Sequence, residues 1–235
     1  MIGSTASQTH PFYQTYMTSS RPILKSILLV ILVLFSGLLC SCSSILTSTI
    51  IKPTLSNLRQ QTDITLVCDG APSYLLMLDS MLVNSPMETG LLRIGSQAFS
   101  SYSAALNGCG DSEEKIQSST EKAREYGLRL LQLKLGMDHI TSGSALDGAL
   151  AQMQKGDVPD LFWGTWGWLT WVRDQHGSPE SMADLVPIVR IMSRLLELDE
   201  TFESGAIHLF FGIYEGTKPV MLGGKPERAR AHFER

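Results

Sequence analysis

Apolar residues recur at helical spacing from about residue 58 to the end of the chain. No run alternates apolar and polar residues over the length that a strand needs, so the fold class is predicted to be all-α. The first segment, residues 62–82, contains Gly70-Ala71-Pro72, where the helix is expected to break or bend. Further helices are expected at residues 87–106, from Asp111 or Ser112 to Leu135, and at about 144–154, 159–174, 181–197, 203–213 and 226–235.

A separate apolar run, from Ser26 to Leu39, carries no charge and follows Arg21 and Lys25. A basic flank, an apolar stretch of about a dozen residues and then small residues are typical of an export signal. The run is shorter than the roughly 20 apolar residues of a spanning helix. An uncleaved membrane anchor is the alternative interpretation. The initiator is either Met1 or Met17.

Two cysteines, Cys40 and Cys42, end this run. Cleavage before Cys42 leaves the small Ser41 at the preceding position, whereas the bulky Leu39 would stand there before Cys40. The segment thus resembles the lipobox of bacterial lipoproteins, and Cys42 is predicted to be acylated and to anchor the chain on a membrane. Ser43, in place of Asp, favours the outer membrane. The predicted regions are an extension and signal peptide (1–41), a lipid anchor and tether (42–57) and a helical domain (58–235).

The last helices have the spacing of a tetratricopeptide (TPR) repeat, a helix pair that stacks on its neighbours. The Phe-Gly at residues 211–212 occupies the Leu-Gly place of the first helix, and the Ala-x3-Phe of the second begins at Ala229. A weaker repeat surrounds Gly95. The sequence therefore predicts a degenerate TPR-like array, a right-handed superhelix. Its packing residues are expected to be Gly95, Ala98, Phe211, Gly212, Ala229 and Phe233.

The chain has 235 residues and a formal net charge of −4, with no Lys/Arg cluster outside the two termini. This argues against a nucleic-acid partner, because proteins that bind nucleic acid carry a basic face. The spacings of zinc, calcium, phosphate and nucleophile motifs are absent, so no metal, cofactor or catalytic residue is predicted. His139 and His208 stand alone, and His208 is expected to be packed rather than liganded.

The order of several stretches resembles one family. After the lipobox come a helical unit that begins at Ser85-Pro86, FWGTWGW at 162–168, HLFFGIYEG at 208–216 and GGKPERARAHFER at 223–235. This combination, over most of residues 50–235, resembles the T-component lipoproteins of tripartite ATP-independent periplasmic (TRAP) transporters.

The resemblance implies a lipid-anchored, TPR-like periplasmic protein that is not an enzyme. It implies association with the periplasmic solute-binding component, the P component, and it makes a homo-oligomer plausible. Because the family continues through further helices, the chain is expected to be truncated at Arg235.

All four tryptophans lie within residues 160–171. On a helix Phe162, Trp166 and Leu169 share one face, and the other tryptophans lie on other faces. A helix that is aromatic on several sides must be buried between neighbours or must line a cavity. The functional hypothesis is an apolar cleft that admits a hydrophobic organic acid, and the alternative is ordinary packing between repeats. The candidate cleft residues are Phe162, Trp163, Trp166, Trp168 and Trp171.

Two basic side chains follow this segment. Arg173 and His176 lie a turn or two beyond it, where they can meet a carboxylate at the mouth of the cleft. A solvated helix end is the alternative interpretation.

The two remaining cysteines suggest a covalent link. If residues 62–82 and 87–106 form an antiparallel hairpin that turns near Ser85, Cys68 and Cys109 lie together near its open end. A disulfide suits the oxidising compartment of an exported protein. Two separate small apolar side chains are the alternative.

Two other functions are consistent with the sequence. One is a TPR lipoprotein scaffold for outer-membrane or envelope assembly. The other is a helical envelope enzyme, such as a hydrolase that uses His208 or His176. Transporter genes beside this gene would favour the TRAP interpretation, and a polar cluster that converges on a pocket would favour the enzyme.

Overall fold

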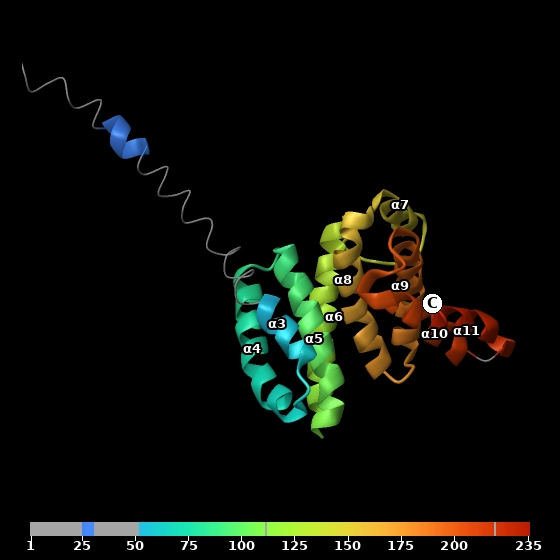
Figure 1. Cartoon of the computed structure of the whole chain (residues 1–235). Coiled ribbons are helices and arrows are strands. Elements are labelled where there is room, and N and C mark those ends of the chain that lie inside the picture. The colour runs from blue at the N-terminus through green and yellow to red at the C-terminus, as the bar shows by residue number, and fades with distance from the viewer. Residues whose placement is uncertain (1–24, 31–51, 111, 219) are drawn as a thin grey trace, which may run out of the picture. The chain divides into compact units, whose positions relative to one another are not determined.

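The computed structural model describes residues 25–30, 52–110, 112–218 and 220–235 (Figure 1). The predictions for Cys40, Cys42 and most of the apolar run lie outside these residues. The chain divides into two compact units, Met1–Pro53 and Thr54–Arg235. In the first unit, residues 25–30 are helical and exposed.

The described part of the second unit consists of helices and connecting turns, which confirms the all-α prediction. The TPR-like arrangement stays a prediction. The elements are α3 (Lys52–Gln60), α4 (Ile64–Asn84), α5 (Thr89–Cys109), α6 (Glu113–Leu135), α7 (Ser144–Gln152), η2 (Lys155–Asp157), α8 (Val158–Asp174), α9 (Pro179–Leu198), α10 (Phe202–Thr217), η3 (Val220–Leu222) and α11 (Pro226–Phe233).

Two details differ from the sequence prediction. Residues 52–57, expected in the tether, belong to α3. The predicted break near Pro72 is absent, because α4 continues through this proline without interruption.

Ser112 is the N-cap of α6, and its hydroxyl accepts a hydrogen bond from the Lys115 amide.

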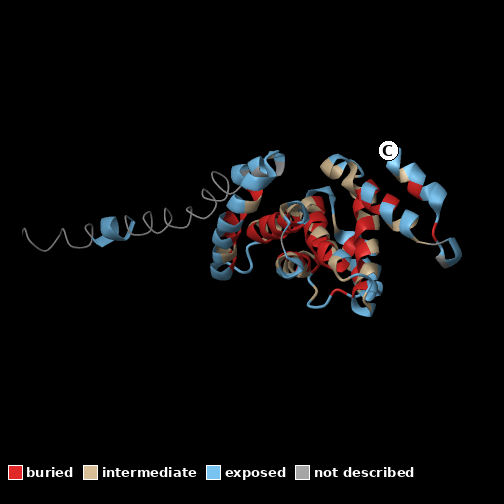
Figure 2. Cartoon of the chain, turned by 90° about the horizontal axis from the view of Figure 1, so that it is seen from below, coloured by how far each residue is buried: buried red, intermediate tan, exposed pale blue. Residues whose placement is uncertain are grey.

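The helices pack in chain order. α4 lies on α5, α5 on α6, α6 on α8 and α8 on α9, while α10 and α11 form a pair at the C-terminal end (Figure 1). α5 also contacts α8, so α6 and α8 form the centre of the bundle. Figure 2 shows the buried residues gathered inside this bundle, whereas the last helix is mostly exposed.

By length and composition, α4 is the one helix in the described part that could cross a membrane. Its inward face is nevertheless part of the core, because Tyr74, Leu75, Leu78 and Leu82 are buried. The amphipathic pattern is typical of a core helix at the edge of a folded domain.

Glycines allow α6 and α8 to cross with their backbones in contact. A Cβ atom added at Gly127 would overlap the carbonyl oxygen of Gly164, and one added at Gly167 would overlap that of Ala123. The hydroxyl of Ser96, on α5, donates to the Trp163 carbonyl at 2.7 Å in the same region. Only glycine permits so close an approach of two helices.

Ion pairs hold the N-terminal end of α8 against α5 and α6. Asp160 lies 2.9 Å from Arg93 and 3.4 Å from Lys134. Lys134 is also 2.7 Å from Asp157, and this hydrogen bond raises the pKa of Lys134 and lowers the pKa of Asp157. The register of α8 on its neighbours is thus fixed by charge as well as by packing.

The glycine crossing gives the first testable prediction. We expect Gly167→Ala to lower the free energy of unfolding by about 1–2 kcal/mol. Overpacking costs about 1–3 kcal/mol, and the gain in helix propensity offsets up to about 1 kcal/mol of it. Gly148 in α7, where a Cβ meets nothing within 4 Å, provides the control. Urea unfolding should show Gly148→Ala to be neutral or stabilising, and equal stabilities of the two variants would contradict the crossing.

Candidate functional site

The tryptophan-rich segment lies mainly in the core. Phe162, Trp163, Trp168 and Trp171 are buried, whereas Trp166 is half-buried. The rings of Phe162 and Trp166 stack with centroids 5.3 Å apart, one helical turn apart on the same face. Packing therefore accounts for most of these side chains, and Trp166 is the one that reaches an apolar cavity.

We call this cavity the apolar pocket. It lies between α8 and α10 and has a volume of about 170 Å³. One wall of the pocket comes from α10, where the rings of Phe210 and Tyr214 stack with their centroids 5.8 Å apart. The lining residues are Trp166, Leu169, Thr170, Arg173, Phe210, Ile213 and Tyr214.

A second cavity, the polar cleft, is also lined by Arg173. Its volume is about 500 Å³, and it is formed by α5, α6 and the end of α8. Thr170 and Arg173 line both cavities. The residues of the polar cleft are Ser103, Ala104, Asn107, Glu113, Ile116, Thr120, Thr170, Arg173, Asp174 and His176.

The structure thus brings Arg173 and His176 to one cavity. Arg173 is exposed and forms no ion pair within the described part of the chain. His176 has a positive φ of 52°, and Gly177 follows with 81°. A left-handed backbone at a non-glycine residue is strained, and such strain concentrates at functional sites.

The other basic residues near α8 all have acidic partners. The guanidinium of Arg124 lies 3.7 Å from the centroid of the Trp171 ring and 3.2 Å from Asp184. Asp184 also accepts a hydrogen bond from the indole nitrogen of Trp168 at 2.7 Å. This cluster joins α6, α8 and α9 through contacts of Trp168 and Trp171.

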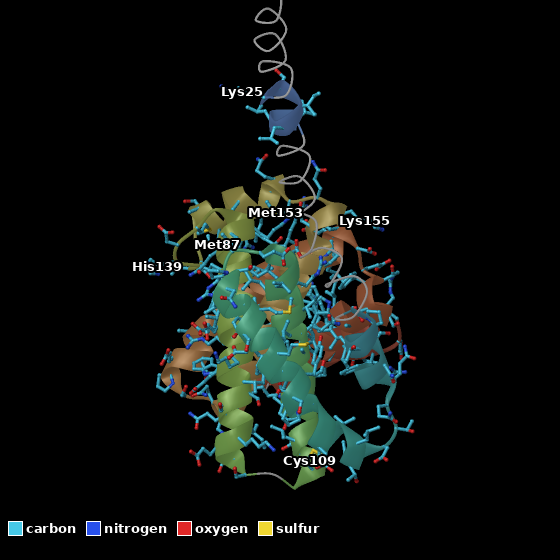
Figure 3. The ribbon with its side chains drawn as sticks, turned by 90° about the vertical axis from the view of Figure 1, so that its left-hand side faces the viewer. Lys25, Met87, Cys109, His139, Met153 and Lys155 are labelled. Carbon is cyan, nitrogen blue, oxygen red and sulfur yellow. A yellow bond between two sulfur atoms is a disulfide. The ribbon has the colours of Figure 1, made fainter. Side chains whose placement is uncertain are left out.

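The histidines occupy different surroundings. His139 is exposed at the periphery (Figure 3). His208 is buried, with its Nδ1 atom 2.9 Å from Nδ1 of His232 and its Nε2 atom 3.3 Å from Glu200. Within the described residues, no group of three or more His, Cys, Asp or Glu side chains is placed to hold a metal ion. Because the Nδ1 atoms of His208 and His232 share one hydrogen, at least one of these two rings must be neutral.

Cys68 and Cys109 are joined by a disulfide, with their Cα atoms 5.9 Å apart. Figure 3 shows Cys109 at the end of the bundle opposite Met87 and Met153. The bond therefore closes the open end of the α4–α5 hairpin, at the place that the hairpin hypothesis gives for the two cysteines.

The residues assigned to repeat packing all lie at helix contacts. A Cβ at Gly95 would overlap Leu82 of α4, and one at Gly212 would overlap the ring of Phe233. Phe233 thus rests on Gly212, although more than half of its surface is exposed. Ala98, Phe211 and Ala229 are buried. The structure shows these contacts, and their place in a TPR-like array stays a prediction.

The histidine pair predicts a pH dependence of stability. Burial, followed by the charge of His208, lowers the pKa of His232 below its ordinary value. In the unfolded chain His232 takes up a proton at about pH 6.5, whereas in the folded chain it does so only at lower pH. Stability should be fully present above that pH and should fall as the pH drops toward the lowered value. Urea unfolding at about pH 7.5 and pH 5.5 measures the difference.

His232→Phe keeps the ring against Phe211 and removes the titration, so its stability should fall less than that of the wild type over this interval. His139→Gln, at an exposed position, serves as the control and should retain the full decrease. An equal decrease in His232→Phe would exclude the pair as its source.

Comparison with known proteins identifies the family. The family model described as TRAP transporter T-component matches residues 60–235. Comparison with curated proteins finds no match. The family consists of transporter accessory components of the bacterial envelope and is not a known enzyme family. The chain belongs to the TRAP transporter T-component family.

Proposed function

We propose that this protein is a lipid-anchored accessory component that docks the periplasmic solute-binding component and holds a hydrophobic organic acid. The transport role rests on the family match over residues 60–235. The ligand role rests on one observation. The guanidinium of Arg173 lies at the edge of an apolar pocket and forms no ion pair within the described residues.

The apolar pocket suits the hydrocarbon part of a small acid. Its volume of about 170 Å³ is below the roughly 300–1,000 Å³ of cavities that enclose a drug-sized ligand. An alkyl or aryl group would pack against Trp166 and Phe210, and its carboxylate would pair with Arg173. The ammonium group of Lys218, 3.5 Å from the centroid of the Tyr214 ring, adds positive charge near the same pocket.

The docking surface is proposed at the C-terminal end. Large apolar side chains are exposed there, and Met221, at 89%, is the most exposed of them. Apolar patches of this kind typically mark contacts with other proteins, in which a few buried anchors dominate the affinity. We define the docking surface as Leu209, Val220, Met221 and Phe233, on α10, η3 and α11.

The packing order supports a TPR-like array. α5 contacts both α6 and α8, as the first helix of a stacked pair contacts its own partner and the next repeat. Such an array presents an extended surface to a partner without any catalytic group. This supports a binding role over the envelope enzyme, and the identity of the bound partner separates transport from a general scaffold.

The anchor is tested by metabolic labelling of cells with an alkynyl fatty acid. We expect the wild type to incorporate the label, because Cys42 would carry the acyl chains of a lipoprotein. Cys42→Ala should lose the label, whereas Cys40→Ala should keep it. Label on Cys42→Ala would refute this assignment.

Docking is tested with the purified solute-binding component that is encoded with the same transporter. Met221→Asp should weaken its binding at least tenfold, since a charge would be buried at the contact. Val83→Asp alters another well-exposed apolar residue, on α4, and should leave the affinity unchanged. Light scattering of the protein alone measures self-association. Recovery from membranes of barrel-assembly proteins, with no solute-binding component, would favour the scaffold.

A further inference from the structure

The polar cleft extends the ligand site beyond the apolar pocket. The two cavities share Thr170 and Arg173, so a ligand whose carboxylate meets Arg173 can contact both. The proposed function uses only the apolar side. Because the polar cleft is the larger cavity, its chemistry decides which polar groups such a ligand can carry.

Three buried hydroxyl groups, from Ser103, Thr120 and Thr170, belong to this cleft. Each has a hydrogen-bond acceptor within its own helix. Ser103 donates to the Ser100 carbonyl at 2.9 Å, and Thr170 donates to the Trp166 carbonyl at 2.8 Å. Since a hydroxyl has one hydrogen, these oxygens have only lone pairs left for a ligand.

The third hydroxyl adds a carboxylate to the same set. Thr120 lies within donating distance of the Gln117 carbonyl, at 2.9 Å, and of the Asp174 carboxylate, at 3.0 Å. Its single hydrogen serves these two acceptors, so its oxygen also offers only lone pairs to a ligand. Glu113 contributes a second carboxylate from the first turn of α6. The cleft therefore combines hydroxyl acceptors with two carboxylates, and the side chains of Asn107 and His176 also line it.

An ammonium group is the natural complement of this arrangement. It carries one positive charge and three donors, and it would pair with Asp174 and the hydroxyl oxygens. A second carboxylate on the ligand would instead lie near Asp174 and Glu113, where like charges repel. Arg173, next to Asp174 in the chain, supplies the opposite charge for a carboxylate on the same ligand.

We propose that the site binds a small zwitterion, an amino acid with an apolar side chain, whose carboxylate pairs with Arg173 and whose ammonium group lies on Asp174 and the hydroxyls of the polar cleft. The apolar side chain occupies the pocket beside Trp166. This inference rests on the proposed function for the carboxylate and the apolar group. It adds recognition of the amino group, which an organic acid lacks.

Isothermal titration calorimetry with matched probes tests each group separately. The full chain is titrated with L-phenylalanine, 3-phenylpropanoate and 2-phenylethylamine, and with the corresponding series of L-leucine, 4-methylpentanoate and 3-methylbutylamine. We expect the amino acid of at least one series to bind at least tenfold more tightly than its acid or its amine. The acid lacks the ammonium group, and the amine lacks the partner of Arg173.

Two variants assign the contacts. Asp174→Asn should weaken binding of the amino acid at least tenfold and leave the affinity for the acid unchanged, because the amide still accepts a hydrogen bond from Thr120 but carries no charge. Arg173→Gln should weaken binding of both the amino acid and the acid. Arg129→Gln provides the control, since Arg129 pairs with Glu125 on the same helix and lines neither cavity, and it should change neither affinity.

The outcomes separate this inference from the proposed function. If the acids bind as tightly as the amino acids and Asp174→Asn does not change the affinity for the amino acids, the proposal of a zwitterionic ligand is wrong and the organic-acid proposal stands. If no probe of either series binds, both statements about the ligand fail, and the docking experiment still tests the transport role. If the amines bind most tightly, the assignment of a carboxylate to Arg173 is wrong.

Discussion

The backbone contact between α6 and α8 is the constraint on which the rest of this structure depends. Gly127 and Gly167 allow it, because any side chain at either position would overlap a carbonyl oxygen of the other helix. The crossing fixes the register of the two helices. Two turns from it Thr120 reaches Asp174, so that the walls of the polar cleft come together. The position of Arg173, nearly two turns beyond Gly167 along α8, follows from the same contact.

Ion pairs connect the helices around α8. Arg93 and Lys134 share Asp160 at the start of the helix, and Arg124 pairs with Asp184 near its end. These pairs hold α5, α6 and α9 in place, and they leave Arg173 without a partner among the described residues. The apolar pocket and the polar cleft thus share an arginine, Arg173, that takes no part in these ion pairs.

The helices were largely predictable because their apolar spacing and caps are local. The predicted tether over residues 42–57 missed the start of α3, and Pro72 does not interrupt α4. The burial of the tryptophan segment followed from its aromatic faces. The pocket itself did not, since Phe210 and Tyr214 lie on a helix whose position depends on long-range packing. The acidic partner of Thr120 was likewise unpredictable, because no local rule brings α6 and α8 into register.

Native-state hydrogen exchange tests the central role of the α6–α8 crossing most directly, since amides in the most stable unit exchange only on global unfolding. The slowest amides should lie in residues 123–131 of α6 and 163–170 of α8, with α4, α10 and α11 exchanging earlier. Slowest exchange in α10 and α11, with early opening at Gly127 and Gly167, would contradict the account.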